Sequence, residues 1–126
     1  MTDIYLEKAK ESLNSAESEL ANRRYNCSAN RAYYACFQAA IAVLIPRGLV
    51  PREHWNHQLV QSRFAGDLVA RRKHYPSQLA DIFNRLMLLR HDADYKATMV
   101  SHKQATRAIR DAQQFVTTVL KGGEQP

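Results

Sequence analysis

The segment from Asn26 to Ile45 constrains the fold more than any other part of the chain, because it is apolar almost all the way round a helix. A helix without a polar face is typically buried, and the many small residues of this segment allow other helices to approach closely. Pro46, Gly48 and Pro51 end it, since proline disfavours helix in the residue before it and has no N–H to donate. The pattern predicts a central, buried helix.

Two further segments have the period of an amphipathic helix. From Asp3 to Asn22 the apolar spacing alternates between three and four, which forms a narrow, heptad-like seam. This seam could pack within the domain or against a second chain, and packing within the domain is favoured. Another helix is predicted from about His57 to Ala70, followed by a basic connector from Arg71 to Pro76. The apolar positions are Leu6, Ala9, Leu13, Ala16 and Leu20 in the first, and Leu59, Val60, Phe64 and Leu68 in the second.

The last two helices are marked by their starting residues. Ser77 is a candidate N-cap for the next helix. Arg90 continues the apolar stripe of that helix, so a charged side chain is expected on its buried face. Ser101 and Gln104 form a capping box for the final helix, which ends near Lys121. No strand pattern competes. The sequence predicts an all-α, antiparallel bundle of about five helices, as one domain over residues 1–126, with its core at about 3–121 and a short flexible tail at 122–126.

Composition excludes several classes of protein. No run of about eighteen apolar residues exists, and the amino terminus carries charges where a signal peptide would need its apolar run. A soluble, cytoplasmic protein without a membrane partner is therefore expected. Cys27 and Cys36 lie in the apolar helical pattern without clustered Cys or His partners, so both are interpreted as core thiols. Neither a metal site nor a cofactor is expected.

Charge is distributed unevenly along the chain. Residues 1–22 contain two Lys and five Asp or Glu, whereas the remainder contains sixteen Lys or Arg and seven acidic residues. A polyanionic partner such as RNA or a nucleotide would suit this excess, because phosphate contacts and counterion release reward clustered cations. A solvated basic surface explains the charge equally well.

The segment from Arg85 to Tyr95 holds the strongest candidates for chemistry, because a mainly apolar helix becomes densely polar there. Arg90 and Asp94 are four residues apart and can pair along one face, Tyr95 adds a hydroxyl, and Arg85 and His91 flank them. The alternative is a buried arginine whose carboxylate and phenol partners tie this helix to the last one. Spacing alone favours that structural interpretation.

Three short motifs nevertheless resemble one known family. Arg90-His-Asp-Ala-Asp-Tyr95 is similar to the R-x-x-A-D-Y signature of a HepT-like branch of the HEPN superfamily. The stretch from Asn30 to Phe37 is similar to the R-A-Y-Y-A-x-F helix of that branch, and His57 followed by Phe64 resembles its H...F element. The resemblance covers about residues 5–120, and the order and spacing of the motifs agree with it.

The resemblance implies a helical bundle that forms a homodimer, with two copies of an R-x(4-6)-H motif around one cleft. Its better-known members are metal-independent ribonucleases, in which the histidine transfers protons and the arginine stabilises the charge on the phosphate. In this chain Tyr95 stands where the histidine should follow Arg90. Arg85 and His91 satisfy the motif literally, but they point about 120° apart on a continuous helix.

Other residues are predicted to contribute to the same cleft. His57 or His91 could replace the missing base if folding or dimerisation brings either beside Arg90. Arg31 could reach the cleft or equally could cap a buried carboxylate. Together with Arg31 and His57, the residues predicted to bind nucleic acid are Arg85, Arg71, Arg72 and Lys73.

Two functions follow as hypotheses. The leading one is a HepT-like protein of a toxin-antitoxin pair that binds or cleaves RNA, with a minimal nucleotidyltransferase as antitoxin. The resemblance further implies a motif tyrosine that this transferase modifies with AMP, for which Tyr95 is the candidate. The alternative is a dimeric binding module without catalysis that supplies a basic helical surface to the transferase domain or its nucleotide.

Overall fold

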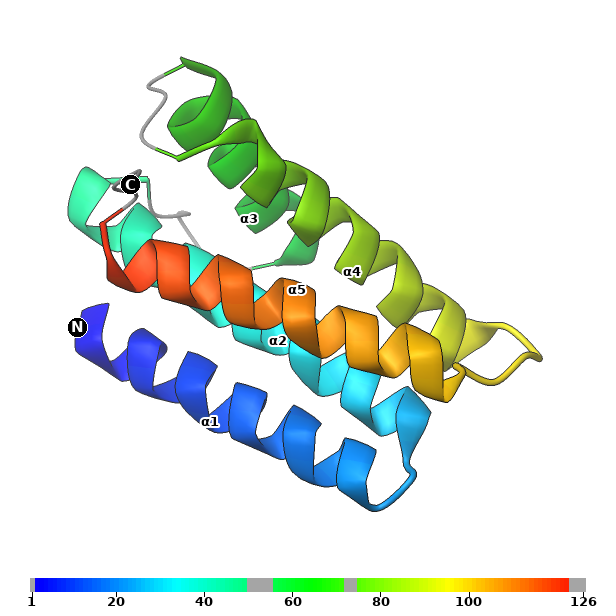
Figure 1. The fold of residues 1–126 in the computed structure, drawn as a ribbon. Coiled ribbons are helices and arrows are strands. Elements are labelled where there is room, and N and C mark those ends of the chain that lie inside the picture. The colour runs from blue at the N-terminus through cyan, green and yellow to red at the C-terminus, as the bar shows by residue number, and fades with distance from the viewer. Residues whose placement is uncertain (1, 50–55, 72–74, 123–126) are drawn as a thin grey trace.

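The computed structural model describes residues 2–49, 56–71 and 75–122, and it is an all-α bundle (Figure 1). Four long helices alternate in direction along a common axis, so that α2 and α5 run the same way. The shorter α3 lies beside α2 and α4. The described residues contain no strand, and the predicted fold class is confirmed. The helices are α1 (Thr2–Ala21), α2 (Tyr25–Leu44), α3 (His57–Arg63), α4 (Ser77–Tyr95) and α5 (His102–Leu120).

Helix α2 is the centre of the bundle, as its apolar sequence predicts. It contacts α1, α3, α4 and α5, and most of its side chains are buried. A short 3-10 turn, Ile45–Arg47, follows it and ends at Gly48, whose φ of 73° is readily adopted only by glycine. Pro46 lies within this turn, which confirms the predicted end of the helix, whereas Pro51 lies outside the described residues.

The α1 seam packs within the domain. Ala9 and Ala16 are fully buried against α2, and the Ser28 hydroxyl donates a hydrogen bond to the Ala16 carbonyl at 2.8 Å. Such a contact requires the two helix backbones to lie close together, which the small residues permit. The apolar seam of α1 therefore packs against α2 within the same chain, which is the favoured one of the two predicted alternatives.

The third helix begins at His57, as predicted, and its hydrogen bonding changes at Phe64. The Asn56 side chain caps it by accepting a hydrogen bond from the Leu59 N–H at 2.8 Å. From Phe64 to Arg71 the helix continues with the wider π-type turn. The Phe64 ring is buried against aromatic rings of α4 and α5, which anchors this helix to the core: its neighbours there are Phe83 and Phe115.

The capping prediction was correct for α5 and wrong for α4. Ser101 and Gln104 form both hydrogen bonds of a capping box. Ser77, by contrast, is the first residue of α4 and makes no capping hydrogen bond. Pro76 occupies the cap position instead, because its constrained φ of −67° suits the entry to a helix and its carbonyl accepts from the Leu79 N–H at 3.0 Å.

The two cysteines differ in their surroundings. Cys36 is fully buried, as predicted, and burial raises the pKa of its thiol. Cys27 is exposed, so its interpretation as a core thiol was wrong. It lies near the start of α2 on the side that borders an open cleft rather than on the side that faces the core. No helix among the described residues is long and apolar enough to cross a membrane.

Candidate functional site

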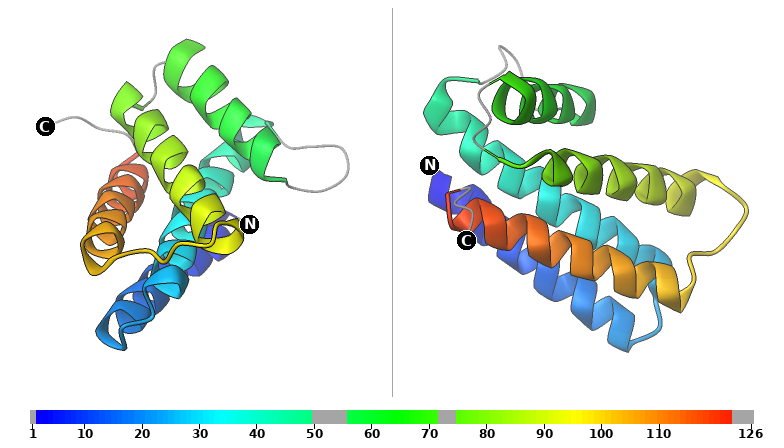
Figure 2. Two further views of the ribbon diagram at one scale, coloured as in Figure 1. Left: turned by 90° about the vertical axis from the view of Figure 1, so that its right-hand side faces the viewer. Right: turned by 45° about the horizontal axis from the view of Figure 1, so that its top comes forward.

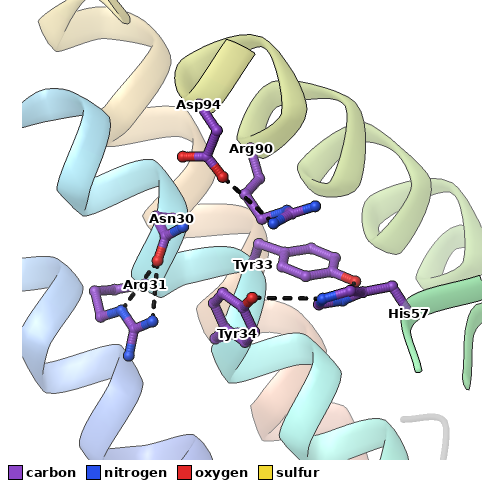
Figure 3. Close-up of polar contacts among 7 residues, drawn as sticks. All are labelled: Asn30, Arg31, Tyr33, Tyr34, His57, Arg90 and Asp94. Carbon is purple, nitrogen blue, oxygen red and sulfur yellow. Dashed lines mark hydrogen bonds and ion pairs between the residues drawn. The ribbon is translucent and has the colours of Figure 1, made fainter. Parts of the chain in front are cut away.

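Arg90 projects from α4 toward α2 and lies over the rings of two tyrosines (Figure 3). The guanidinium carbon is 5.2 Å from the ring centre of Tyr33 and 6.0 Å from that of Tyr34. A guanidinium at this distance is attracted by the aromatic ring, and the attraction grows when water is excluded. Only 15% of the Arg90 side chain is exposed. The predicted arrival of a charge on the buried face of this helix is confirmed.

Asp94 partly neutralises this cation. Its Oδ2 lies 3.3 Å from Nη1 of Arg90, one turn earlier in α4, so the predicted pair is confirmed. The buried Nε of Arg90 has no hydrogen-bond partner in the described part of the chain. An unpaired buried donor costs free energy, so a hydrogen-bond acceptor that reached this nitrogen would be bound favourably.

The same tyrosines bind His57 at the start of α3. The Tyr33 hydroxyl is 2.7 Å from Nδ1 of His57, and the Tyr34 hydroxyl is 3.4 Å from Nε2. Tyr33 thus contacts Arg90 through the face of its ring and His57 through its hydroxyl (Figure 3). A base and a cation from two different helices are thereby held around one aromatic side chain.

Burial and charge control the protonation of this cluster. Burial, and secondly the Arg90 cation, lower the pKa of His57 below its ordinary value of 6.5. Burial also raises the pKa of Tyr33 far above its ordinary value of 10. At neutral pH the imidazole of His57 is therefore neutral and the Tyr33 phenol keeps its proton. A neutral imidazole next to a fixed cation can accept a proton while the cation stabilises negative charge.

An open cleft of about 410 Å³ borders the cluster between α1, α2 and the end of α4. Arg31 lines it, with its guanidinium 4.9 Å from the centre of the Tyr34 ring. Of the two roles considered for Arg31, the structure favours the cleft, because its partner is the Asn30 amide oxygen, at 2.9 Å from Nη2, and not a buried carboxylate. Asp94 also lines the cleft and so lies between it and Arg90.

Other predicted site residues lie elsewhere. Tyr95 is 72% exposed and packs against His91, with 4.9 Å between ring centres, so neither is a described partner of Arg90. Arg85 pairs with Asp111 of α5 at 3.2 Å. The predicted tie between α4 and the last helix is thus made by Arg85, whereas Arg90 packs against α2.

The basic connector is only partly described. Arg71 ends the π-helical segment, and nothing is described of its side chain. Arg72 and Lys73 lie outside the described residues. No group of three His, Cys, Asp or Glu residues suited to a metal ion occurs in the described ranges.

Tyr33 is the functional candidate that sequence reasoning did not identify. Tyr33 lies in the stretch from Asn30 to Phe37 that carries the family resemblance, and it is fully buried. A buried tyrosine hydroxyl nonetheless needs a hydrogen-bond partner, and this general rule was the available signal. The identity of that partner, His57, depends on a contact between helices that spacing does not encode.

The fold and this cluster define a helical-bundle protein in which an arginine and a histidine from different helices contact the same buried tyrosine. The sequence signature of the HEPN domain matches residues 2–122, and the chain belongs to the HEPN domain family.

Two relatives are similar along nearly the whole chain. A Methanocaldococcus jannaschii protein named "Putative toxin MJ0605" is 28% identical over 122 residues, covering 92% of this chain and 84% of the relative. A Thermotoga maritima protein named "UPF0332 protein" is 28% identical over 120 residues, covering 94% of this chain and 88% of the relative.

Replacing Arg90 with alanine should lower the free energy of unfolding by about 2–3 kcal/mol, because it removes the contact with Tyr33 and leaves the half-buried Asp94 unpaired. Tyr95→Phe should change it by less than about 0.5 kcal/mol, since that side chain is exposed. Urea denaturation followed by circular dichroism measures both. Equal stability of Arg90→Ala and the unmodified protein would contradict the structural importance of this contact.

Proposed function

We propose that this chain is the HEPN toxin of a toxin-antitoxin pair, and that it cleaves RNA without a metal ion, using Arg90 and His57. One observation carries the proposal: the Arg90 guanidinium and the neutral His57 imidazole are held by the same side chain, Tyr33. The M. jannaschii relative is named a toxin, which supports the toxin assignment. In this proposal His57 acts as the base, in place of the motif histidine, whose position is occupied by Tyr95.

The reaction requires one proton acceptor and one stabiliser of negative charge. His57 accepts the proton of the ribose 2′-hydroxyl while that oxygen forms a bond to phosphorus. Arg90 stabilises the charge that develops on the phosphate oxygens. The bond from phosphorus to the 5′-oxygen breaks, that oxygen takes a proton from water, and a 2′,3′-cyclic phosphate remains.

Tyr33 orients the base for this step. If Nδ1 of His57 carries the hydrogen and donates it to the Tyr33 oxygen, Nε2 is left as the proton acceptor. Nε2 is directed toward Tyr34 at the longer distance of 3.4 Å, a contact that an incoming 2′-hydroxyl can replace. Arg31, on the other side of Tyr34, is proposed to bind a neighbouring phosphate from the cleft.

A non-catalytic binding module is the second candidate. The exposure of Tyr95 favours it, because the residue at the position of the motif histidine has no contact with Arg90. In that case Arg90, Tyr33 and His57 hold α2, α3 and α4 together, and the chain presents its basic surface to a nucleotidyltransferase or its nucleotide.

We expect the protein to cleave structured RNA in buffer containing EDTA. His57→Asn keeps a polar group near the Tyr33 hydroxyl but removes the base, so cleavage should fall by about 100-fold or more. His91→Asn is the matched control, because it makes the same change at an exposed histidine of α4 that packs against Tyr95. The measurement is single-turnover cleavage on a denaturing gel.

The pH profile of the same assay tests the assignment of the base. Because burial and the Arg90 cation lower the pKa of His57 below 6.5, the rate should fall with decreasing pH, with the midpoint of the fall below pH 6.5. An intact RNA with the unmodified protein, or equal cleavage by His57→Asn, would leave the binding module as the better account.

The proposal includes a homodimer with one shared cleft. Met99, just after the end of α4, is a large apolar residue that is exposed in the single chain, and such a pairing would cover it. Light scattering should therefore give twice the 14.4 kDa mass of the chain. A monomeric mass at micromolar concentration would rule out a cleft shared between two copies.

A minimal nucleotidyltransferase is proposed as antitoxin, and Tyr95 as the residue that it modifies. The exposed Tyr95 hydroxyl can attack the α-phosphorus of ATP, forming an AMP ester as pyrophosphate leaves and the phenol proton is released. Mass spectrometry after incubation with the neighbouring transferase and ATP should find AMP on Tyr95 and none on Tyr95→Phe. AMP on a different tyrosine, or none, would refute this assignment.

A further inference from the structure

The outward side of α5 carries a row of cations. Lys103, Arg107 and Arg110 are exposed and follow one another at spacings of four and three, so they share one side of the helix. At about 1.5 Å of rise per residue the row is about 10 Å long. These three residues are called the α5 basic stripe. Together with His102 and Thr106 they line an open hollow of about 390 Å³.

Among the described residues, none with an acidic side chain forms an ion pair with the stripe. Lys103, Arg107 and Arg110 form no ion pair within the described part of the chain, whereas other exposed cations do. The nearest acidic residue in sequence, Asp111, already pairs with Arg85 of α4. The positive charge of the stripe is therefore available to an external anion.

Charge is also segregated between neighbouring helices. Helix α1 contains five acidic and two basic residues, while α5 contains three Lys or Arg and one Asp. Of these two helices, α5 carries the positive charge, so an elongated anion would be attracted to α5 and repelled by α1. In the left view of Figure 2, α5 forms the side of the bundle away from α3.

We infer that the α5 basic stripe binds the phosphodiester backbone of RNA, at a surface separate from the Arg90 and His57 cluster. The inference rests on the proposed function for the choice of RNA as ligand. A row of evenly spaced cations suits a row of phosphates. A second copy of the chain fits poorly, because a two-fold axis through the stripe would place like charges opposite each other. The stripe holds the substrate and takes no part in bond cleavage.

The test compares two triple variants that remove the same charge. The stripe variant is K103Q/R107Q/R110Q. The control variant is R24Q/K10Q/K96Q, whose three exposed cations already pair with Glu19, Glu7 and Asp92. Fluorescence anisotropy measures binding of a labelled single-stranded RNA over a range of salt concentrations, and circular dichroism verifies folding.

The stripe variant should bind RNA roughly tenfold or more weakly at about 0.1 M salt, and its slope of log affinity against log salt should be smaller by about two. The control variant should retain most of the slope. Equal slopes for the stripe variant and the unmodified protein would overturn the inference. So would a stripe-dependent affinity for polyglutamate that matches the affinity for RNA, because it would indicate an acidic protein as ligand.

Binding and cleavage separate this inference from the proposed function. His57→Asn retains the stripe and removes no positive charge at neutral pH, so its salt slope should equal that of the unmodified protein while cleavage is lost. If RNA binding depends on the stripe but the RNA is never cut, the inference about the stripe stands and the proposed nuclease activity is refuted. If the RNA is cut but the stripe variant has an unchanged salt slope, the proposed nuclease activity stands and the inference about the stripe is refuted.

Discussion

The contact between the Arg90 guanidinium and the Tyr33 ring is the interaction on which the site depends. It places a cation between α4 and the buried α2, where that charge needs both an aromatic face and the Asp94 carboxylate. The same ring reaches His57 through its hydroxyl, so α3 is tied to the pair. The cation and the neutral base thus come from α4 and α3, and both are held by a side chain of α2.

Small residues in α2 make this arrangement possible. Alanines along that helix allow α1 and α5 to pack closely, while the large Tyr33 fills the side that faces α3 and α4. The tyrosine hydroxyl cannot be buried without a partner, and His57 supplies one. Core packing and the candidate chemistry therefore use the same side chain, which is why a change at Arg90 is expected to affect stability as well as activity.

Much of the fold could be predicted because helix period, capping and breaker residues are local signals. The buried α2, the α1 seam and the capping box at Ser101 all follow from spacing. The entry to α4 was misassigned because serine is a preferred capping residue, whereas this helix already includes Ser77 and begins directly after Pro76. Cys27 was misassigned because a helix buried over most of its length still exposes its first turn.

The site was predictable only in part, for the same reason. Arg90 and Asp94 are one turn apart, so their pairing can be read from spacing. The contact of His57 with Tyr33 joins residues 24 apart in sequence and depends on how α3 packs, which no periodicity specifies. Tyr95 follows Arg90 closely in sequence, yet the helix turns it outward to solvent.

The central claim is that Arg90 and His57 contact the same linkage of bound RNA, Arg90 at the phosphate and His57 at the adjacent 2′-oxygen. Nitrogen-15 NMR of the protein titrated with a 2′-O-methyl RNA, which binds without being cut, tests it most directly. Both the Arg90 Nε resonance and the His57 imidazole resonances should shift, and in His57→Asn the Arg90 signal should still move. Saturating RNA that leaves both sets of resonances unchanged, while signals elsewhere on the protein shift, would contradict the account.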